Sequence, residues 1–551
     1  MADAPLGLLA KRIASSEAIR RVAGNDGATL SVASQAQAIA IAGLSLASEA
    51  SLLVVCVTQA DAEVLAHDLK GFLGEDSGRT HGLSDAAVAV LPAWDTLPFE
   101  RVSPDVATMG ERLETRLRIE GDEAPSVVVT SMRGALQLLP HEAVVARRLT
   151  KGTRLELEEM ATWLVEHGYR REPQVEHRGE FSIRGGIIDI FSSSASTPLR
   201  IDLFGDEVDR LFSFDPGDQR SRDLILEAVI LPARECTATP AIRQRASTLA
   251  ESQAWASSSL QRLVEGQCFD GMEGFFGLLD QDRITVTSLL GPQASIVLLE
   301  PTRLRSRALE LLDEERSLVT SLLETWDAKG IDTAAVGLHA DLDQLLSTSD
   351  AVTISMPSAS ENPSTPQLST GSIEVVAGDA GRLASQIIRW RDKNFHVVAS
   401  VATPRSAERF IEVTAAEGVT ALSRQLVPAD AEVSVVVSGL SRGFVLPEQG
   451  IVVLAESDIT GRRSPHRAPR PRPKVTTGFF DDLGVGSYVV HRQHGIARFS
   501  GVTTRTVGET TREYLILEFR GGDRIYLPVD QIDMITPYSA GDAPTLSKMG
   551  G

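Results

Sequence analysis

Short apolar runs alternate with amphipathic segments over the first 135 residues of the chain. Residues 52–57, 88–91 and 127–129 are apolar runs of strand length. The segment QADAEVLAHDLKGFL, which follows the first of these runs, repeats apolar side chains at helical spacing. Because strands that alternate with helices favour a parallel sheet, this part of the chain predicts an α/β domain.

Closely spaced strands are predicted in the next part of the chain. Residues 155–170 are amphipathic and carry Gly168 near their end, which favours a helix with a glycine C-cap. The runs GEFSIRG, GIIDIF and PLRIDLFGDEVDRLFSF then follow, with glycine-containing turns between them. The pattern predicts a small unit of one helix and an antiparallel sheet at residues 139–218.

Helical stretches at residues 241–263 and 303–327 precede a second α/β pattern, which begins near residue 351. Its predicted elements are strands at 352–355, 373–376, 396–400 and 433–437, and helices at 380–392 and 404–417. This alternation predicts a second α/β domain.

The composition changes abruptly at residues 461–477, GRRSPHRAPRPRPKVTT. This segment has four prolines, six Lys or Arg residues and no acid, which predicts an extended, polyproline-like basic linker. Its basic side chains either contact DNA or keep a solvated tether extended, and both interpretations stay open. Residues 478–551 then contain short strand-like runs around glycine-containing turns, which predicts a small β-barrel.

Charge and cysteine content exclude several classes of protein. The 54 Lys and Arg residues face 74 Asp and Glu residues, so the formal net charge is −20. That balance excludes a protein that coats DNA or an anionic membrane with its whole surface. The three cysteines are far apart, which argues against a disulfide framework and a Cys-rich zinc site. No apolar run approaches the ~20 residues of a membrane span, and we expect a soluble cytoplasmic protein without a membrane partner.

The sequence contains none of the common catalytic motifs. A GxxxxGK[ST] phosphate loop is absent, and residues 29–43, where an α/β nucleotide fold would place it, contain Ser, Gln and Ala in place of Gly and Lys. His491 and His494 lie on a predicted strand and turn, where turn or surface histidines are favoured over a metal site. We therefore predict no catalytic, cofactor-binding or metal-binding residue, and no enzymatic activity of this chain alone.

Three segments have residue types typical of partner binding, and each has a structural alternative. Trp94 and Phe99 lie among prolines and either form a binding loop or anchor a crossing loop to the core. A cluster of arginines near Phe181 is either a partner hot spot or a solvated strand face with ordinary ion pairs. The members of this cluster are Arg170, Arg171, Arg178 and Arg184. Residues 503–507 are either an edge strand that accepts a partner strand, with Arg505 pointing toward the partner, or an ordinary hairpin.

Several stretches resemble bacterial transcription-repair coupling factors (Mfd). Residues 168–221, which begin GYRREPQVEHRGEFSIRGGIIDIF, are similar to the UvrB-homology module of that family. LPAWDTLPFERVSPDVATMGERL at 91–113 and LAESDITGRR at 454–463 resemble the same proteins. Residues 486–533, which begin GSYVVHRQHGIARFSGV, resemble the RNA-polymerase-interacting domain of the family, which is CarD-like. These matches occur in order along nearly the whole chain.

The resemblance implies a multidomain machine that binds stalled RNA polymerase through its β subunit and recruits UvrA for transcription-coupled nucleotide excision repair. In the family, an ATP-dependent translocase motor that acts on double-stranded DNA follows the polymerase-binding domain. We therefore expect the chain to be the amino-terminal, adaptor portion of a longer protein, in which only the motor needs ATP and magnesium. The alternatives are a CarD-like transcription regulator and a UvrB-like nucleotide-dependent repair enzyme.

The resemblance also gives each predicted domain an identity. The domains are a UvrB-like α/β domain with a degenerate P-loop at 1–138 and 219–350, a UvrA-binding α+β insert at 139–218, an α/β third domain at 351–460, the linker at 461–477 and a CarD-like β domain at 478–551.

The same comparison implies the contact residues. Those expected to bind UvrA are Arg170, Arg171, Phe181 and Arg184. Those expected to bind RNA polymerase are Thr503, Thr504, Arg505, Thr506 and Val507. The linker residues that would contact DNA are Arg462, Arg463, Arg467, Arg470, Arg472 and Lys474. UvrB-type proteins commonly carry a second arginine where Ser182 stands here, so one charge contact is expected to be missing.

Overall fold

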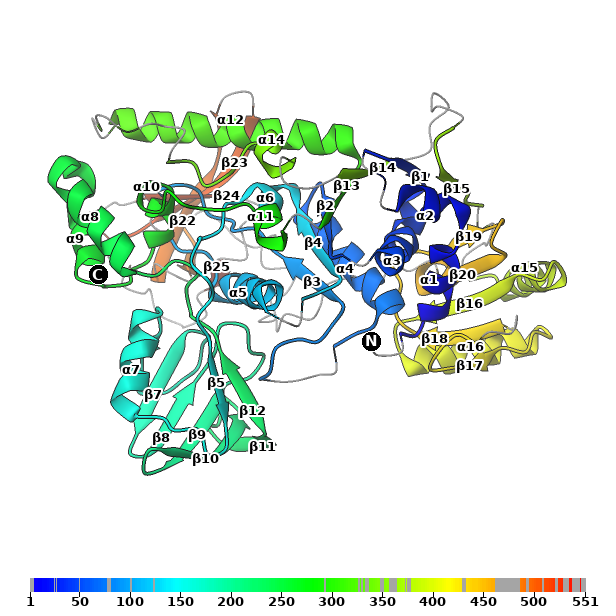
Figure 1. Ribbon diagram of the computed structural model, residues 1–551, viewed down its shortest axis with the longest axis horizontal. Helices are drawn as coiled ribbons and strands as arrows, with labels where there is room; N and C mark the ends of the chain where they lie inside the picture. The colour runs from blue at the N-terminus through cyan, green and yellow to red at the C-terminus, as the bar shows by residue number, and fades with distance from the viewer. Residues whose placement is uncertain are drawn as a thin grey trace. The chain divides into compact units, whose positions relative to one another are not determined.

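A computed structural model shows two compact units, Met1–Ser464 and Pro465–Gly551 (Figure 1). The structure describes residues 4–551 except 24, 26, 49, 77–80, 100–101, 122–123, 292–293, 326–327, 329–330, 332–335, 347–350, 356–363, 372, 374–377, 429–432, 461–485, 492–494, 508–509, 521–523, 529–534, 538–545 and 547–551. Within these residues, no helix is both long and apolar enough to cross a membrane.

The first unit is built around a seven-stranded sheet with the strand order β15-β1-β14-β13-β2-β4-β3. Its strands are β1 (Thr29–Val32), β2 (Leu52–Cys56), β3 (Val88–Leu91), β4 (Val127–Ser131), β13 (Ser295–Leu299), β14 (Ala351–Ser355) and β15 (Gln367–Leu368). All described strand pairs are parallel, as the sequence predicts. The central strands β2 and β4 are buried along their whole length because helices cover both faces of the sheet.

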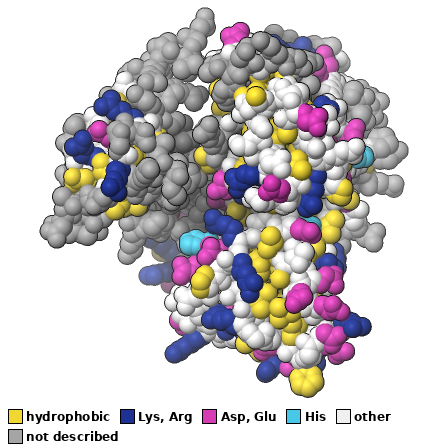
Figure 2. Space-filling model, turned by 90° about the vertical axis from the view of Figure 1, so that its left-hand side faces the viewer, with side chains coloured by type: hydrophobic (Ala, Val, Ile, Leu, Met, Phe, Trp, Pro, Cys, Tyr) yellow, Lys and Arg dark blue, Asp and Glu magenta, His cyan; other side chains and the backbone are white. Residues whose placement is uncertain are grey.

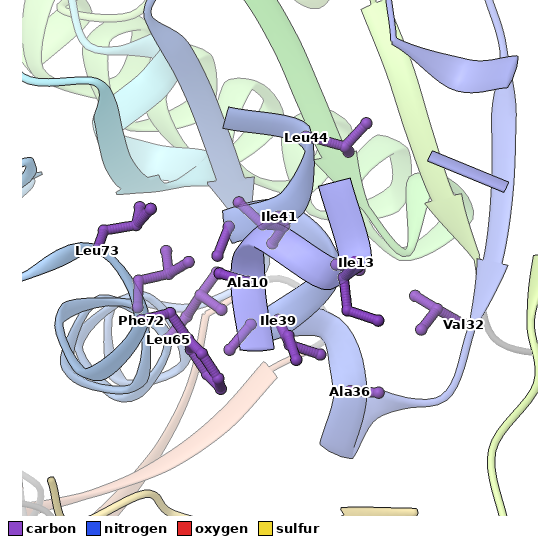
Figure 3. Packing of buried hydrophobic residues seen from close by; sticks show 14 of the residues in the cluster. Ala10, Ile13, Val32, Ala36, Ile39, Ile41, Leu44, Leu65, Phe72 and Leu73 are labelled. Carbon is purple, nitrogen blue, oxygen red and sulfur yellow. The ribbon is translucent and has the colours of Figure 1, made fainter. Parts of the chain in front are cut away.

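Two separate apolar clusters lie on the two faces of this sheet. Leu52 and Val54 of β2 contribute to the cluster that contains α1 (Gly7–Ala14), α2 (Glu17–Val22), α3 (Gln37–Ala47) and α4 (Gln59–Leu73). Figure 3 shows side chains of α1, α3 and α4 packed together in this cluster. Leu53 and Val55 point the other way, toward α6 (Met132–Leu136), α11 (Val286–Leu290), α12 (Pro301–Thr325) and α14 (Leu342–Leu346).

A six-stranded sheet with the order β11-β10-β9-β8-β7-β6 forms a lobe at the bottom of Figure 1. Its strands are β6 (Arg170–Arg171), β7 (Glu180–Arg184), β8 (Ile187–Ile190), β9 (Leu199–Phe204), β10 (Glu207–Phe214) and β11 (Ser221–Ile225). The sheet packs on α7 (Leu157–Glu166), while β5 (Arg147–Thr150) and β12 (Glu227–Ile230) form a two-stranded sheet beside it.

Two details of this lobe differ from the sequence-based expectation. The sheet is not wholly antiparallel, because β6 pairs with β7 in parallel. The strands also continue past residue 218 through β11 and β12, so the predicted unit at 139–218 omits the last strands of the lobe. The sequence pattern did not distinguish these strands because β11 is largely exposed and has no apolar alternation of its own.

A second sheet in the first unit has the order β17-β18-β16-β20-β19. Its strands are β16 (His396–Val401), β17 (Leu422–Ser423), β18 (Val433–Val437), β19 (Phe444–Leu446) and β20 (Ile451–Ala455), with α15 (Ala380–Asp392), α16 (Pro404–Ala416) and α17 (Glu456–Thr460). The expectation that residues 352–355 open this domain is wrong, because that segment is β14 and pairs with β1 and β13 of the first sheet. Residues 374–376 of the predicted strand at 373–376 lie outside the described residues.

The second unit contains a five-stranded antiparallel sheet with the order β24-β23-β22-β21-β25. Its strands are β21 (Tyr488–His491), β22 (Gly495–Val507), β23 (Thr510–Glu518), β24 (Arg524–Pro528) and β25 (Ile535–Pro537). Among the residues of this unit whose side chains the structure describes, the buried apolar ones are Val489, Ala497, Phe499, Leu515, Leu517 and Phe519.

Candidate partner-binding surfaces

Arg170 and Arg171 form the short edge strand β6, which the chain enters directly after α7. Gly168, with a φ of 87°, reverses the chain at the end of the helix, and the Tyr169 backbone N–H donates to the Leu164 carbonyl at 2.9 Å. The Tyr169 side chain is buried and its hydroxyl donates to the Leu231 carbonyl. Both arginines are exposed as a result of this turn.

The charges of these two arginines are only weakly neutralised. Arg170 Nη2 lies 3.9 Å from Glu180 Oε1, which is a long ion pair. The other oxygen of Glu180 accepts hydrogen bonds from the backbone N–H groups of Glu176 and His177, each at 2.9 Å. Among the described residues, no ion pair involves Arg171. The pair with Glu180 agrees with the ordinary ion-pair alternative, yet both guanidinium groups stay accessible to a partner.

Arg184 is held in place by a buried carboxylate but remains half exposed. Its Nη2 lies 3.0 Å from Oδ2 of Asp189, whose side chain is buried. The same carboxylate binds Arg200 with two hydrogen bonds of 2.7 and 2.9 Å, and these bonds raise the pKa of Arg200. The side chain of Arg184 retains 50% exposure. Asp189 therefore fixes the direction of Arg184 without removing it from the surface.

The structure corrects the expected role of Phe181. Its side chain is fully buried in the core between the sheet and α7, so it is not on the surface that a partner would contact. The strand register places Phe181 opposite Ile190 of β8, which in turn lies opposite Leu199 of β9, and all three side chains are buried in the same core. Ser182 is buried as well, and its hydroxyl donates to the Pro173 carbonyl at 3.2 Å. Arg178 donates to the Ala195 carbonyl of its own lobe.

The residues predicted to bind RNA polymerase, 503–507, form the C-terminal end of β22. Residues 503–507 pair with residues 510–514 of β23, whereas β21 pairs with β22 only from Gly495 to Arg498. In the described strand pairings, the segment 503–507 therefore has a paired neighbour on one side only, which is the arrangement of an edge strand. The side chains of residues 504–507, including Arg505, lie outside what the structure describes.

The loop that contains Trp94 is an anchor to the core. Trp94 is 1% exposed, and its Nε1 donates to Glu235 Oε2 at 2.9 Å. The guanidinium of Arg112, on α5 (Val106–Glu120), donates to the same carboxylate at 2.6 Å and lies 5.5 Å from the Trp94 ring. Phe99 is 7% exposed and packs edge-on against Trp255. The anchoring interpretation of this loop is confirmed.

The position of a phosphate loop is occupied by a tight connection. After β1, a single 3-10 turn at Ser34–Ala36 leads into α3, whose N-cap Ala36 offers no side-chain hydrogen bond. A Cβ on Gly43 of α3 would lie 2.9 Å from Ile13 Cγ2, so α1 packs directly against α3. Among the described residues, no group of three or more His, Cys, Asp or Glu side chains could hold a metal ion. His494 and the six basic linker residues lie outside the described part of the chain.

Sequence reasoning did not identify Asp189 and Arg200. Each is a polar residue within an alternating apolar strand, which is a recognisable signal for a buried or functional group. Their partnership could not be read from the sequence, because it depends on the register that places Asp189 opposite Arg200 in neighbouring strands.

Two family models match the chain, the UvrB interaction domain at residues 148–236 and the CarD-like/TRCF RID domain at residues 483–539. Over its whole length the chain is 32% identical to the transcription-repair-coupling factor of Mycobacterium tuberculosis (strain CDC 1551 / Oshkosh). The chain is related to the transcription-repair-coupling factors. The resemblance inferred from the sequence is thereby confirmed.

Other transcription-repair-coupling factors give the same result. Those of Myxococcus xanthus and Bacillus subtilis (strain 168) are 29% and 28% identical, over 93% and 85% of the chain. The chain spans about half the length of the curated relatives it matches, with 48% of the M. tuberculosis protein and 45% and 42% of the other two.

Proposed function

We propose that the chain is an adaptor that binds stalled RNA polymerase through its β subunit and recruits UvrA for transcription-coupled nucleotide excision repair. The observation that supports this most is the presence, in one chain and in this order, of a UvrB interaction domain and a CarD-like/TRCF RID domain. Either domain alone would leave the similarity over the rest of the chain unexplained.

The polymerase arm is β22, which adds to a strand of the β subunit. Residues 503–507 carry backbone groups on the side away from β23, and strand addition uses such groups. Each backbone hydrogen bond gained contributes about 0.5–1.5 kcal/mol net, so several together give useful affinity. We propose Arg505 as the residue of this segment that contacts the partner. We propose further that the antiparallel sheet of this unit closes into a small barrel.

The UvrA arm is the exposed arginine set of the six-stranded sheet. Arg170, Arg171 and Arg184 are accessible and offer planar guanidinium groups to carboxylates of the partner. In this proposal Phe181 packs in the core of the lobe and does not touch UvrA.

The remaining features are proposed by analogy with the longer relatives. The first domain is a UvrB-like fold with a degenerate P-loop, and the complete protein is an ATP-dependent translocase on double-stranded DNA that acts in the cytoplasm. The linker at 461–477 spans roughly 50 Å if its 17 residues extend by ~3.1 Å each. Its six basic residues contact DNA in this proposal, and that contact weakens as salt rises.

Charge reversal at each arm tests the proposal. Arg505→Glu is expected to reduce co-purification of the chain with the RNA polymerase β subunit and to leave UvrA binding intact. Arg170→Glu combined with Arg184→Glu is expected to do the opposite, because it repels the carboxylates that the arginines attract. Arg409→Glu, an exposed arginine on α16, is the matched control and should change neither interaction. Equal loss of both partners in one variant, or retention of both in all variants, would contradict the assignment.

A further inference from the structure

Several large apolar side chains are exposed to solvent on the outer face of the six-stranded sheet. The inner face carries one continuous apolar row that packs on the core of the lobe: Ile183, Ile188, Ile201, Leu211 and Ile225. Since side chains alternate along a strand, the neighbouring rows point outward. Part of that outer face is covered by Val175 and Phe191, which pack on Phe214. The rest is open.

The open part begins at a residue already assigned to UvrA. Arg184 of β7 lies opposite Ile187 of β8, Ile187 lies opposite Asp202 of β9, and Asp202 lies opposite Arg210 of β10. The adjacent row continues through Phe212 of β10 to Leu224 on the edge strand β11. Arg184 at the end of β7 and Leu224 on the edge strand β11 are therefore connected by neighbouring outward-facing residues of the sheet.

Large apolar side chains are exposed along this surface. Phe204 and Leu226 are 84% and 82% exposed, and they are the most exposed large apolar side chains of the described residues. Leu224 is 58% and Ile187 39% exposed. Figure 2 shows hydrophobic side chains gathered on this lower lobe among basic and acidic ones. Exposed apolar surface rimmed by charges is typical of a protein-binding site.

The charges of this surface favour an acidic partner over a second copy of the chain. The outer rows carry three arginines, Arg184, Arg200 and Arg210. They carry two acids: Asp189, which binds both Arg184 and Arg200, and Asp202. The arginines therefore exceed the acids by one. Arg210 Nη2 lies 3.6 Å from Asp202 Oδ2, a partly exposed pair that contributes little to stability. Two copies of this surface would place an excess of positive charge against itself, whereas a partner with carboxylates around an apolar patch would be complementary.

We propose that the UvrA-docking surface extends from Arg184 across the outer face of the sheet to Leu224 and Leu226. This inference rests on the proposed function. Four strand spacings of ~4.8 Å separate β7 from β11, so roughly 19 Å of surface is involved, which fits within one standard interface of about 800 Å² per partner. The arginines steer and orient the encounter, and the apolar residues near β11 form the desolvated centre that slows dissociation.

Binding kinetics of purified UvrA on the immobilised full chain test this. Leu224→Ser combined with Leu226→Ser is expected to raise the Kd about tenfold or more, through faster dissociation and equally at low and high salt, as loss of an apolar hot spot does. Arg184→Glu is expected to slow association, with an effect that shrinks as salt rises. Leu309→Ser, which changes a 65%-exposed leucine on α12, is the matched control and should stay within about twofold.

The outcomes separate this inference from the proposed function. Weakening by Arg184→Glu with an unchanged double serine variant overturns the extended surface and leaves the adaptor function standing. Absence of any UvrA binding by the unaltered chain overturns both. Sedimentation of the unaltered chain as a dimer that the serine variant dissociates, with UvrA binding unchanged, would make the face a self-interface and also overturn the inference.

Discussion

Burial of His81 couples the folding of the lobe to pH. The side chain is 6% exposed, Nε2 lies 3.2 Å from the Thr197 hydroxyl, and the His81 carbonyl accepts from the Val229 backbone N–H. Desolvation lowers the pKa of His81 from 6.5 to about 4. The unfolded chain therefore binds a proton at higher pH than the folded chain does. The stability from the neutral ring is complete above pH 6.5 and is lost as the pH falls from 6.5 toward 4.

A His81→Gln variant is expected to lose this part of the acid sensitivity. The unaltered chain should lose up to about 3 kcal/mol more unfolding free energy than the variant between pH 7 and pH 4, because one unit of pKa shift corresponds to about 1.4 kcal/mol. Urea denaturation at several pH values measures the difference. Identical pH profiles for the two proteins would show that the ring does not titrate differently in the folded state.

Three elements meet at one buried ion pair. The carboxylate of Glu235, which follows β12, accepts hydrogen bonds from Arg112 on α5 and from Trp94 after β3. The side chains of Arg112 and Glu235 are fully buried. This cluster connects the lobe to the seven-stranded sheet, and it holds the Trp94 loop against the core.

Glu235→Ala is expected to lower the unfolding free energy by about 3–5 kcal/mol, because it leaves the Arg112 guanidinium buried without its counter-charge. Chemical denaturation measures the loss. The double variant Arg112→Met with Glu235→Leu removes both charges and should be less destabilised than Glu235→Ala alone. A double variant that is as unstable as the single one would show that packing, and not the unpaired charge, determines the loss.

At the scale of the whole molecule, the described residues between β1 and α3 do not form a loop that could hold the phosphates of a nucleotide. The connection between β1 and α3 has neither a glycine-rich turn nor a lysine, and α1 packs on α3. We expect the purified chain to release no phosphate from Mg-ATP above background, with or without DNA. A phosphate-release assay checks this, with a P-loop ATPase as the positive control. Hydrolysis that rises in proportion to the concentration of the chain would contradict the prediction.

Elements with a strong local pattern could be predicted closely. The structure confirms α4 at Gln59–Leu73, β3 at Val88–Leu91 and α15 at Ala380–Asp392, which coincide with the runs identified in the sequence. Each of these depends on side-chain periodicity within a single segment, which is a local property. The arginines of β6 and β7 could likewise be named from their residue types.

Pairing, burial and partnership were decided by the tertiary structure. The pattern of β14 is that of a strand, but whether it joins the first or the second sheet depends on which distant strand its backbone pairs with. The burial of Phe181 and the bridge from Asp189 to Arg184 and Arg200 depend in the same way on strand register. The sequence by itself determined where strands and helices form and which family the chain resembles. The tertiary structure decided which residues remain exposed to a partner, because exposure is set by contacts between segments that are far apart in the chain.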